Sequence, residues 1–192
     1  MLDKAEQNNE IKKGQVVVEC TSGNTGMGVV LTSVIRGFKP YITIPDKMSN
    51  EKINRLKALG AEVVVCPTEV DPYLPEGYKG RAKKIAEEHN GYFPNQYNNP
   101  NNPEIHYRTT GLEIAEQMEG KLDYFVATVG TGGTITGCSK ILKEKIPNIK
   151  VVGVDPIGSS LALPESLNVE EGKMYRIEGT GQAHPTPSLD RN

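Results

Sequence analysis

Two short loops of small and polar residues contain the side chains that could bind an anion. One reads Thr-Ser-Gly-Asn-Thr-Gly over residues 21–26, and the other reads Gly-Thr-Gly-Gly-Thr over residues 130–134. Each follows a short apolar run, 16–18 or 125–129, and precedes a stretch with helical character. Backbone N–H groups converge on an anion in such a strand–loop–helix context. The sequence therefore predicts two anion-binding loops, neither of which contains a side chain that could do covalent chemistry unaided.

The loop at residues 130–134 lacks the spacing of the common nucleotide-binding motifs. In Gly-x-Gly-x-x-Gly counted from Gly130, the third glycine would fall at Ile135, and a Walker A alignment places Cys138 where a lysine is required. A nest of N–H groups with two threonine hydroxyls at a helix N-terminus suits a single phosphate monoester. The alternative is a tight strand-to-helix turn in which the glycines only permit close packing.

The loop at residues 21–26 combines hydroxyls, an amide side chain and backbone N–H groups at the start of a helix. A carboxylate fits there through charge-assisted hydrogen bonds. The alternative is plain capping, in which Ser22 or Asn24 serves its own helix. Capping accounts for only part of this loop, and the remaining positions favour a ligand.

The length, composition and net charge of the chain limit the class of protein. The chain has 192 residues, 36% hydrophobic and 24% charged, which is enough for one domain or two small lobes with a core. Its net charge of −2 argues against nucleic acid or an anionic membrane as the main partner. No apolar run approaches the roughly 20 residues of a membrane span. Three isolated cysteines favour a reduced, cytoplasmic setting, and three scattered histidines give no metal-ligand spacing, so no metal site is predicted.

The elements that must position the loops alternate along the chain. Helices are predicted over residues 1–13 (ended by Gly14), 24–36 (ended by Gly37), 49–59 (with Ser49 as N-cap), 81–89, 103–118 and 133–145. Strands are predicted over residues 15–20, 41–44, 62–66, 92–93, 123–129, 150–154 and 174–178. Alternation with apolar strands predicts an α/β fold with a parallel sheet and helices on both faces. Both ends look unfinished, so we expect a fragment of a larger domain.

The two loops and their order resemble those of fold-type II pyridoxal-phosphate enzymes, most closely the cystathionine β-synthase and cysteine synthase family. Further landmarks of the resemblance lie at residues 45–49, 56–62, 99–103, 120–123 and 151–156. Segments that favour cystathionine β-synthase lie at residues 158–162, 164–165, 178–179 and 189–191. The resemblance implies a tryptophan synthase β-like fold with a mostly parallel, twisted sheet. The chain would be an N- and C-terminally truncated single fragment, in which about 15–118 includes the smaller substrate-loop lobe and about 119–192 is part of the larger phosphate-binding lobe.

The same resemblance implies roles for individual residues. The cofactor pyridoxal 5'-phosphate would be held at its phosphate by Gly130, Thr131, Gly132, Gly133 and Thr134, and at its ring oxygen by Asn24. The carboxylate of an amino-acid substrate would be bound by Thr21, Ser22, Gly23 and Thr25, with Gln96 as a second contact. Without the resemblance, Gln96 would be read as an ordinary solvated loop residue.

The implied reaction is β-replacement on serine or O-acetylserine with a thiol. Cysteine synthase (O-acetylserine sulfhydrylase) activity is one alternative, and a non-catalytic pseudoenzyme that binds a ligand or partner is another. The family's Schiff-base lysine lies upstream of this chain, so no catalytic residue is assigned, the question of enzyme activity stays open, and we expect the fragment itself to be inactive. Lys4, Lys12 and Lys13 are read as surface lysines. The resemblance also implies a homodimer.

Overall fold

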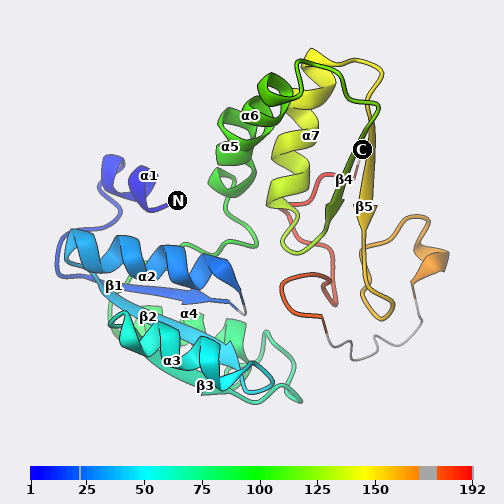
Figure 1. Ribbon diagram of the computed structural model, residues 1–192. Coiled ribbons are helices and arrows are strands. Elements are labelled where there is room, and N and C mark those ends of the chain that lie inside the picture. The colour runs from blue at the N-terminus through cyan, green and yellow to red at the C-terminus, as the bar shows by residue number, and fades with distance from the viewer. Residues whose placement is uncertain (22, 169–176, 192) are drawn as a thin grey trace. The chain divides into compact units, whose positions relative to one another are not determined.

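The computed structural model describes residues 1–21, 23–168 and 177–191, which form two compact units. Unit 1 comprises Met1–Asn95 and unit 2 comprises Gln96–Asn192 (Figure 1). Each unit contains its own parallel sheet. The predicted α/β class with parallel strands is confirmed, although the strands form two sheets instead of one. The assignment of 15–118 and 119–192 to two lobes of a complete enzyme stays a prediction.

Unit 1 alternates helices and strands around a three-stranded sheet. Its elements are α1 (Leu2–Gln7), β1 (Val16–Cys20), α2 (Asn24–Arg36), β2 (Lys39–Pro45), α3 (Asn50–Ala58), β3 (Glu62–Cys66) and α4 (Tyr78–Glu88). The strands are parallel in the order β1-β2-β3, with Val18 opposite Tyr41 and Ile42 opposite Val63. All five residues of β1 are buried, as expected for a strand covered on both faces.

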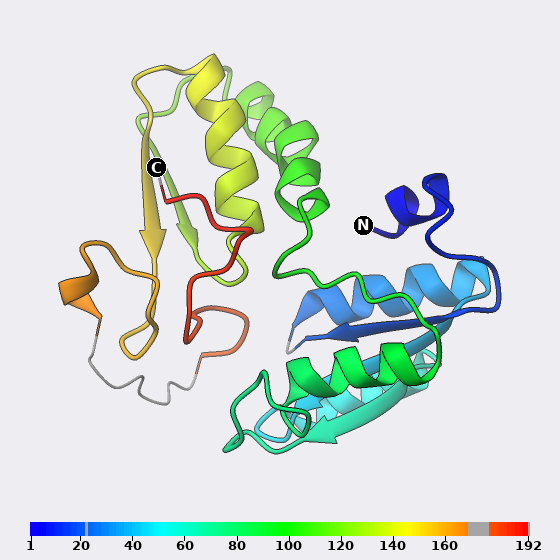
Figure 2. The ribbon, with the colours of Figure 1, turned by 180° about the vertical axis from the view of Figure 1, so that it is seen from behind.

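After β3, the chain returns to the opposite edge of this sheet and runs beside β1. Tyr92 forms a parallel bridge with Val17, and its N–H and C=O bond to Val16 and Val18, at 2.8 and 2.9 Å. Because parallel crossovers are right-handed, the steps from β1 to β3 place α2 and α3 on one face and the return step places α4 on the other. Figures 1 and 2 show this arrangement. The strand predicted at 92–93 is therefore reduced to a single bridge.

Two helix boundaries of unit 1 follow the predicted signals. Helix α2 ends at Arg36 because Gly37 takes the left-handed conformation, with φ of 76°. At the start of α3, the Ser49 hydroxyl accepts a hydrogen bond from the N–H of Lys52 at 3.4 Å. Both predictions are confirmed.

The helix predicted over 1–13 is too long. Helix α1 ends at Gln7 because Asn9 takes a positive φ of 58°, and the N–H of Glu10 then bonds to the Ala5 carbonyl at 2.8 Å. Asparagine tolerates this left-handed conformation better than most residues, so Asn9 ends the helix ahead of Gly14, the residue expected to end it.

Two further predictions differ from the structure. The helix predicted over 103–118 is divided at Thr109, where φ is −125° and ψ is −80°. Helix α4 begins at Tyr78 and not at Arg81, since Gly77 is its N-cap. The strand predicted over 174–178 lies outside the described residues at 174–176, and residues 177 and 178 are not in a strand.

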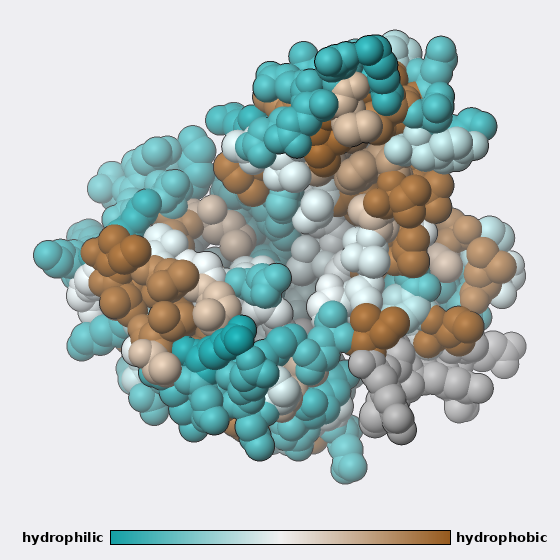
Figure 3. All heavy atoms as spheres, in the orientation of Figure 1, coloured by the Kyte–Doolittle hydropathy of each residue, from teal (hydrophilic) through white to brown (hydrophobic). Residues whose placement is uncertain are grey.

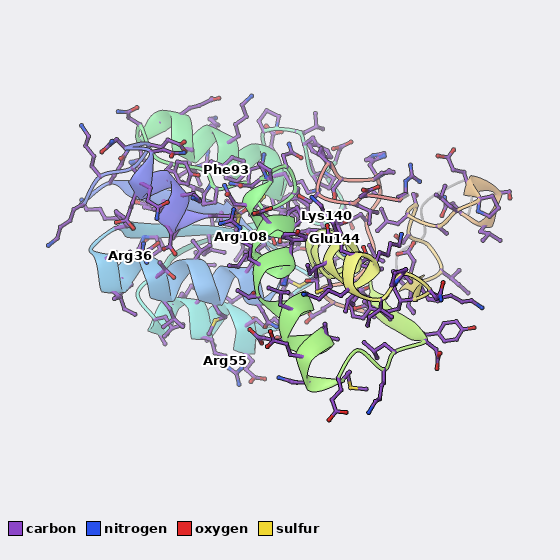
Figure 4. All side chains as sticks on the ribbon, turned by 90° about the horizontal axis from the view of Figure 1, so that it is seen from above. Arg36, Arg55, Phe93, Arg108, Lys140 and Glu144 are labelled. Carbon is purple, nitrogen blue, oxygen red and sulfur yellow. The ribbon has the colours of Figure 1, made fainter. Side chains whose placement is uncertain are left out.

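Unit 2 contains a parallel β–α–β arrangement that confirms the predicted one. Its elements are α5 (Asn101–Arg108), α6 (Thr110–Gln117), β4 (Tyr124–Thr128), α7 (Gly133–Lys145), β5 (Lys150–Val154) and the 3-10 helix η1 (Glu165–Leu167). Helix α7 packs against α5 and α6. On the side of α7 that faces α5, Glu144 accepts a hydrogen bond from the Tyr107 hydroxyl at 2.9 Å, and the Lys140 ammonium lies 4.9 Å from the centre of the Tyr107 ring (Figure 4).

One face of the β4–β5 sheet is covered and the other is exposed. Phe125 and Val151 contact the core on the inner face, whereas Tyr124, Val126 and Val152 are exposed on the outer face. Figure 3 shows hydrophobic residues gathered over this sheet and over the C-terminal half of α2. No helix in the described part of the chain combines the length and the apolar character that crossing a membrane requires.

Candidate functional site

Each predicted anion-binding loop joins a parallel strand to a helix. The loop at 21–26 connects β1 to α2 in unit 1, and the loop at 130–134 connects β4 to α7 in unit 2. Gln96 belongs to unit 2 and therefore to the same unit as the second loop. In parallel α/β sheets, ligands bind beyond the carboxyl ends of the strands, where both loops lie.

The loop at 130–134 presents the start of α7 as a set of hydrogen-bond donors. Helix α7 begins at Gly133, and its first intrahelical bond runs from the N–H of Thr136 to the carbonyl of Gly132 at 2.9 Å. The helix itself thus supplies no acceptor for the N–H groups of its first turn, which concentrate positive potential there. The hydroxyl of Thr134, an exposed residue in this turn, adds a further donor. This donor set fits a phosphate monoester.

Three glycines of this loop are required by close packing. A Cβ atom on Gly130 would lie 2.5 Å from the carbonyl oxygen of Gly179, and one on Gly133 would lie 2.2 Å from the Asn102 side chain. Gly132 has a φ of 88°, and a Cβ there would lie 2.4 Å from that of Leu189. The glycines thus permit close packing, and the same loop has a donor geometry that suits an anion. Phosphate binding and the packing-only alternative both stay predictions.

Distant segments of unit 2 brace the same loop. The Asn102 side-chain NH₂ donates to the Thr131 hydroxyl at 3.0 Å and to the Gln96 carbonyl at 2.8 Å. The buried Thr186 hydroxyl donates to the Thr131 carbonyl, and the N–H of Asp190 donates to the Thr136 hydroxyl at 2.9 Å. Sequence reasoning missed these residues. Asn102 lies in a landmark of the resemblance, at 99–103, and that was the signal available for finding it.

His106 of α5 connects two threonines in unit 2. Its Nδ1 lies 3.0 Å from the Thr110 hydroxyl oxygen, and its Nε2 lies 3.1 Å from the Thr134 hydroxyl oxygen. Burial lowers the pKa of this half-buried imidazole below its ordinary value of 6.5, which favours the neutral form at pH 7. The sequence analysis did not select His106, because a single histidine on a helix carries no signal of its own.

Gln96 is placed by its backbone. Its carbonyl oxygen accepts hydrogen bonds from the Asn102 side chain at 2.8 Å and from the buried Ser188 hydroxyl at 3.2 Å. The residue is 6% exposed, so it is not the solvated loop glutamine that the sequence alone suggested. Through Asn102, the structure brings Gln96 and Thr131 to the same hydrogen-bonded cluster.

The loop at 21–26 is closed by local bonds. Thr21 is buried, its N–H donates to the Thr43 carbonyl at 3.1 Å, and its hydroxyl accepts from the N–H of Gly23 at 3.1 Å. A Cβ on Gly26 would lie 2.6 Å from the Thr21 methyl group. Ser22 lies outside the described residues.

Among the residues that the structure describes, none caps helix α2 through its side chain. Its N-cap is Gly23, without a capping hydrogen bond from a side chain, and Asn24 is the first residue of the helix. The alternative prediction that Asn24 caps its own helix is therefore wrong. Thr25 follows within the first helical turn. The start of α2 consequently retains N–H donors for a ligand, as a carboxylate site requires.

Cys20 and Glu19 are both buried at the end of β1, directly before this loop. Burial, followed by the neighbouring Glu19 carboxylate, raises the pKa of the Cys20 thiol well above its ordinary value. The thiol is therefore neutral at pH 7 and a poor nucleophile. Cys20 is thus a small buried residue directly before the loop, with no sign of a chemical role.

Comparison with known proteins defines the family. The chain matches the model of the pyridoxal-phosphate dependent enzyme family over residues 1–190, and it belongs to that family. It is 53% identical over 182 residues to a cystathionine beta-synthase of Dictyostelium discoideum, covering 94% of this chain and 36% of that protein. It is 43% identical over 185 residues to a cysteine synthase of Staphylococcus aureus, covering 94% of this chain and 56% of that protein.

Solved structures agree with the sequence comparison. An O-acetylserine dependent cystathionine beta-synthase from Helicobacter pylori has a TM-score of 0.88 at 33% identity, covering 100% of this chain and 60% of that one. An O-ureido-L-serine synthase has a TM-score of 0.88 at 30% identity, covering 99% and 58%. The resemblance and the fold type expected from the sequence are confirmed. The chain spans 34–39% of the length of six curated cystathionine beta-synthases that it matches.

Proposed function

We propose that the full-length protein is a pyridoxal-phosphate dependent β-replacement enzyme that joins serine or O-acetylserine to a thiol. The observation that carries this proposal is the loop at 130–134, which combines the donors of the α7 N-terminus with threonine hydroxyls in a chain of this enzyme family. A phosphate monoester at that position gains charge-assisted hydrogen bonds and a favourable helix dipole.

Each predicted site residue has a role in this proposal. The cofactor phosphate is held by Gly130, Thr131, Gly132, Gly133 and Thr134, and Asn24 donates to the ring oxygen. The substrate carboxylate is held by Thr21, Ser22, Gly23, Thr25 and Gln96. The donors at the start of α2 and the buried position of Gln96 support these assignments.

Pyridoxal phosphate supplies an electron sink for bond breaking at the amino-acid Cα when it is bound. The residues of this chain bind and orient. Held at its carboxylate by the loop at 21–26, the amino acid loses rotational freedom, and its Cα–H bond is fixed for proton removal. Neither loop is assigned a proton-transfer role.

The preference for cystathionine β-synthase over cysteine synthase rests on the segments after residue 156. Ser159 is buried, and its hydroxyl donates to the carbonyl of Gln182 at 3.0 Å and accepts from its N–H at 2.9 Å. The segment at 158–162 thus holds the loop at 181–184, which the resemblance places near the substrate. Cysteine synthase activity remains the second candidate, supported by the relative from Staphylococcus aureus.

The partners in this proposal are a small amino acid and a second copy of the chain in a homodimer, without nucleic acid or a membrane. The negative net charge supports the exclusion of nucleic acid and of an anionic membrane, and the unpaired cysteines support a cytoplasmic location. The free cysteines Cys20, Cys66 and Cys138 are all buried.

An assay of the purified full-length protein tests the proposal. We expect it to retain pyridoxal phosphate after gel filtration and to form product from serine and a thiol faster than from O-acetylserine and sulfide. The reverse preference would support the second candidate. Retained ligand with no turnover of either substrate would support a pseudoenzyme, and no retained cofactor would contradict the proposal.

A further inference from the structure

His106 contacts the loop at 130–134 as the middle member of a hydrogen-bonded row of three side chains, Thr110, His106 and Thr134. The Thr110 and Thr134 hydroxyl oxygens lie 3.0 and 3.1 Å from opposite nitrogens of the imidazole. Thr110 belongs to α6, His106 to α5 and Thr134 to α7, and all three helices are in unit 2. Thr134 is exposed, whereas His106 is half-buried, so this row of side chains leads from the helix interface toward the surface.

The position of His106 is set by the contact between α5 and α7. Gly137 of α7 leaves room for it, because a Cβ at Gly137 would lie 2.8 Å from that of His106 and 2.1 Å from the Pro103 carbonyl oxygen. The buried Cys138 thiol lies 4.0 Å from the His106 carbonyl oxygen. The imidazole thus approaches Thr134 from a helix that is held closely against α7.

The hydrogen bonds around a neutral His106 can run in either of two directions. A neutral imidazole has one N–H, and each threonine hydroxyl has one proton. If Nδ1 carries the proton, Nε2 accepts from Thr134, and the Thr134 proton is turned toward His106. If Nε2 carries the proton, it donates to the Thr134 oxygen, Thr110 donates to Nδ1, and the Thr134 proton is left for another acceptor.

We propose that His106 is a positioning residue for phosphate binding, which as the Nε2–H tautomer turns the Thr134 hydroxyl proton toward the phosphate of the ligand. A phosphate dianion only accepts hydrogen bonds, so its presence selects this tautomer. Thr110 stabilises it by donating to Nδ1. The inference rests on the proposed function, because it takes the phosphate of pyridoxal 5'-phosphate as the occupant.

The competing interpretation is a histidine that only joins α5 to α7. A joining role requires both hydrogen bonds, but it depends neither on which atom donates nor on whether the ligand has a phosphate. The proposed role makes the effect of His106 dependent on the ligand phosphate and on the Thr134 hydroxyl. These two dependences separate the interpretations.

The test compares variants of the full-length protein by their affinity for pyridoxal 5'-phosphate and for pyridoxal, which lacks the phosphate. His106→Gln places an amide donor near the position of Nε2, and we expect it to keep the affinity within about 2-fold. His106→Asn removes that donor, and we expect about 5- to 10-fold weaker binding of the phosphorylated ligand, the worth of one hydrogen bond, with pyridoxal unaffected. His89→Gln, whose ring lies against Tyr41 in unit 1, is the matched control and changes neither affinity.

A double-mutant cycle tests whether His106 acts through Thr134. In a Thr134→Val background, His106→Asn has no remaining hydroxyl to orient, so we expect less than about 2-fold further loss. Additive losses, or an equal loss for both ligands, would overturn the proposal. If His106→Asn does not fold, Thr110→Val removes the Nδ1 partner from the far side and is measured in its place, with the same expected dependence on the ligand phosphate.

Histidine ¹⁵N spectra give a readout that needs no cofactor. We expect inorganic phosphate to shift His106 toward the Nε2–H tautomer, and Thr110→Val to weaken that shift. An Nδ1–H tautomer in protein saturated with phosphate would overturn the inference. Failure of the proposed function is distinguishable: pyridoxal phosphate would then not be retained, whereas inorganic phosphate would still select the tautomer. Binding of neither ligand would overturn both.

Discussion

The two predicted anion-binding loops have the same place in their β–α connections but are held in different ways. In unit 1, the loop at 21–26 is closed mainly by bonds among its own residues and to the adjacent strand β2. In unit 2, the loop at 130–134 is held by Asn102 and Thr186, which lie 29 and 55 residues away along the chain from their bonding partner Thr131. In the proposed function, the loop at 130–134 must keep a cofactor through many turnovers and benefits from such bracing, whereas the loop at 21–26 must bind and release a substrate.

The contrast extends into the helices that follow. Gly28 and Gly137 are both the fifth residue of their helix, in α2 and α7 respectively. A Cβ at Gly28 would have no atom within 4 Å, whereas one at Gly137 would lie 2.1 Å from the Pro103 carbonyl oxygen. The same residue type at the same helical position is thus dispensable in one unit and required in the other.

The largest effect is expected from alanine at these two glycines. Gly137→Ala forces α5 away from α7 and should lower the free energy of unfolding by about 2–3 kcal/mol. Gly28→Ala should raise it by roughly 0.5–1 kcal/mol, since alanine favours the helix and reduces the entropy of the unfolded chain. Urea denaturation of the full-length protein measures both. Equal effects of the two substitutions would mean that the helices do not differ as described.

A smaller loss is expected when the bracing of the phosphate loop is removed. Asn102→Ala removes one hydrogen-bond donor from the Gln96 carbonyl and one from the Thr131 hydroxyl, so we expect a loss of about 1–2 kcal/mol in stability and weaker binding of pyridoxal phosphate. Asn101→Ala is the control, because the Asn101 side chain bonds only locally, to Asn99, at 3.0 Å. If both variants bind the cofactor equally well, Asn102 does not position the loop.

Replacing one threonine hydroxyl by a methyl group in each loop should show which ligand that loop binds. Thr21→Val should raise the KM for the amino acid by about 10-fold and leave cofactor affinity unchanged, whereas Thr134→Val should weaken the cofactor by a similar factor. Steady-state kinetics at saturating cofactor and equilibrium dialysis measure the two quantities. The assignment of one ligand to each loop is wrong if the Thr21 substitution releases the cofactor.

The sequence predicted the elements that have local signals. Gly37 and Ser49 mark helix ends by conformation and by capping, and both boundaries are confirmed. The division of the helix at Thr109 was missed although Thr109, Thr110 and Gly111 are all poor helix formers. The bracing of the loop at 130–134 had no local signal, since Thr186 and Asn102 reach it only through the tertiary fold. The roles of the site residues remain predictions carried by the resemblance.

A further effect is expected at alkaline pH. Burial raises the pKa of the Cys138 thiol from 9.0 to about 11. Below pH 9.0 the thiol is neutral in both states, and between those values the unfolded chain ionises first, so the free energy of unfolding falls as pH rises. Cys138→Ala should flatten this part of the stability profile, and Ser139→Ala, its neighbour without a titrating thiol, should not. Parallel profiles for Cys138→Ala and the unsubstituted protein would contradict the assignment.

The central claim is that the loop at 130–134 binds the phosphate of the cofactor. Its most direct test is the affinity of the full-length protein for pyridoxal 5'-phosphate and for pyridoxal, measured before and after Gly132→Val. A side chain at Gly132, with its φ of 88° and the nearby Leu189, must distort the loop. We predict that the phosphorylated ligand binds at least about 10-fold more tightly than pyridoxal and that the substitution abolishes this difference. Equal affinities for the two ligands in the unsubstituted protein would contradict the account.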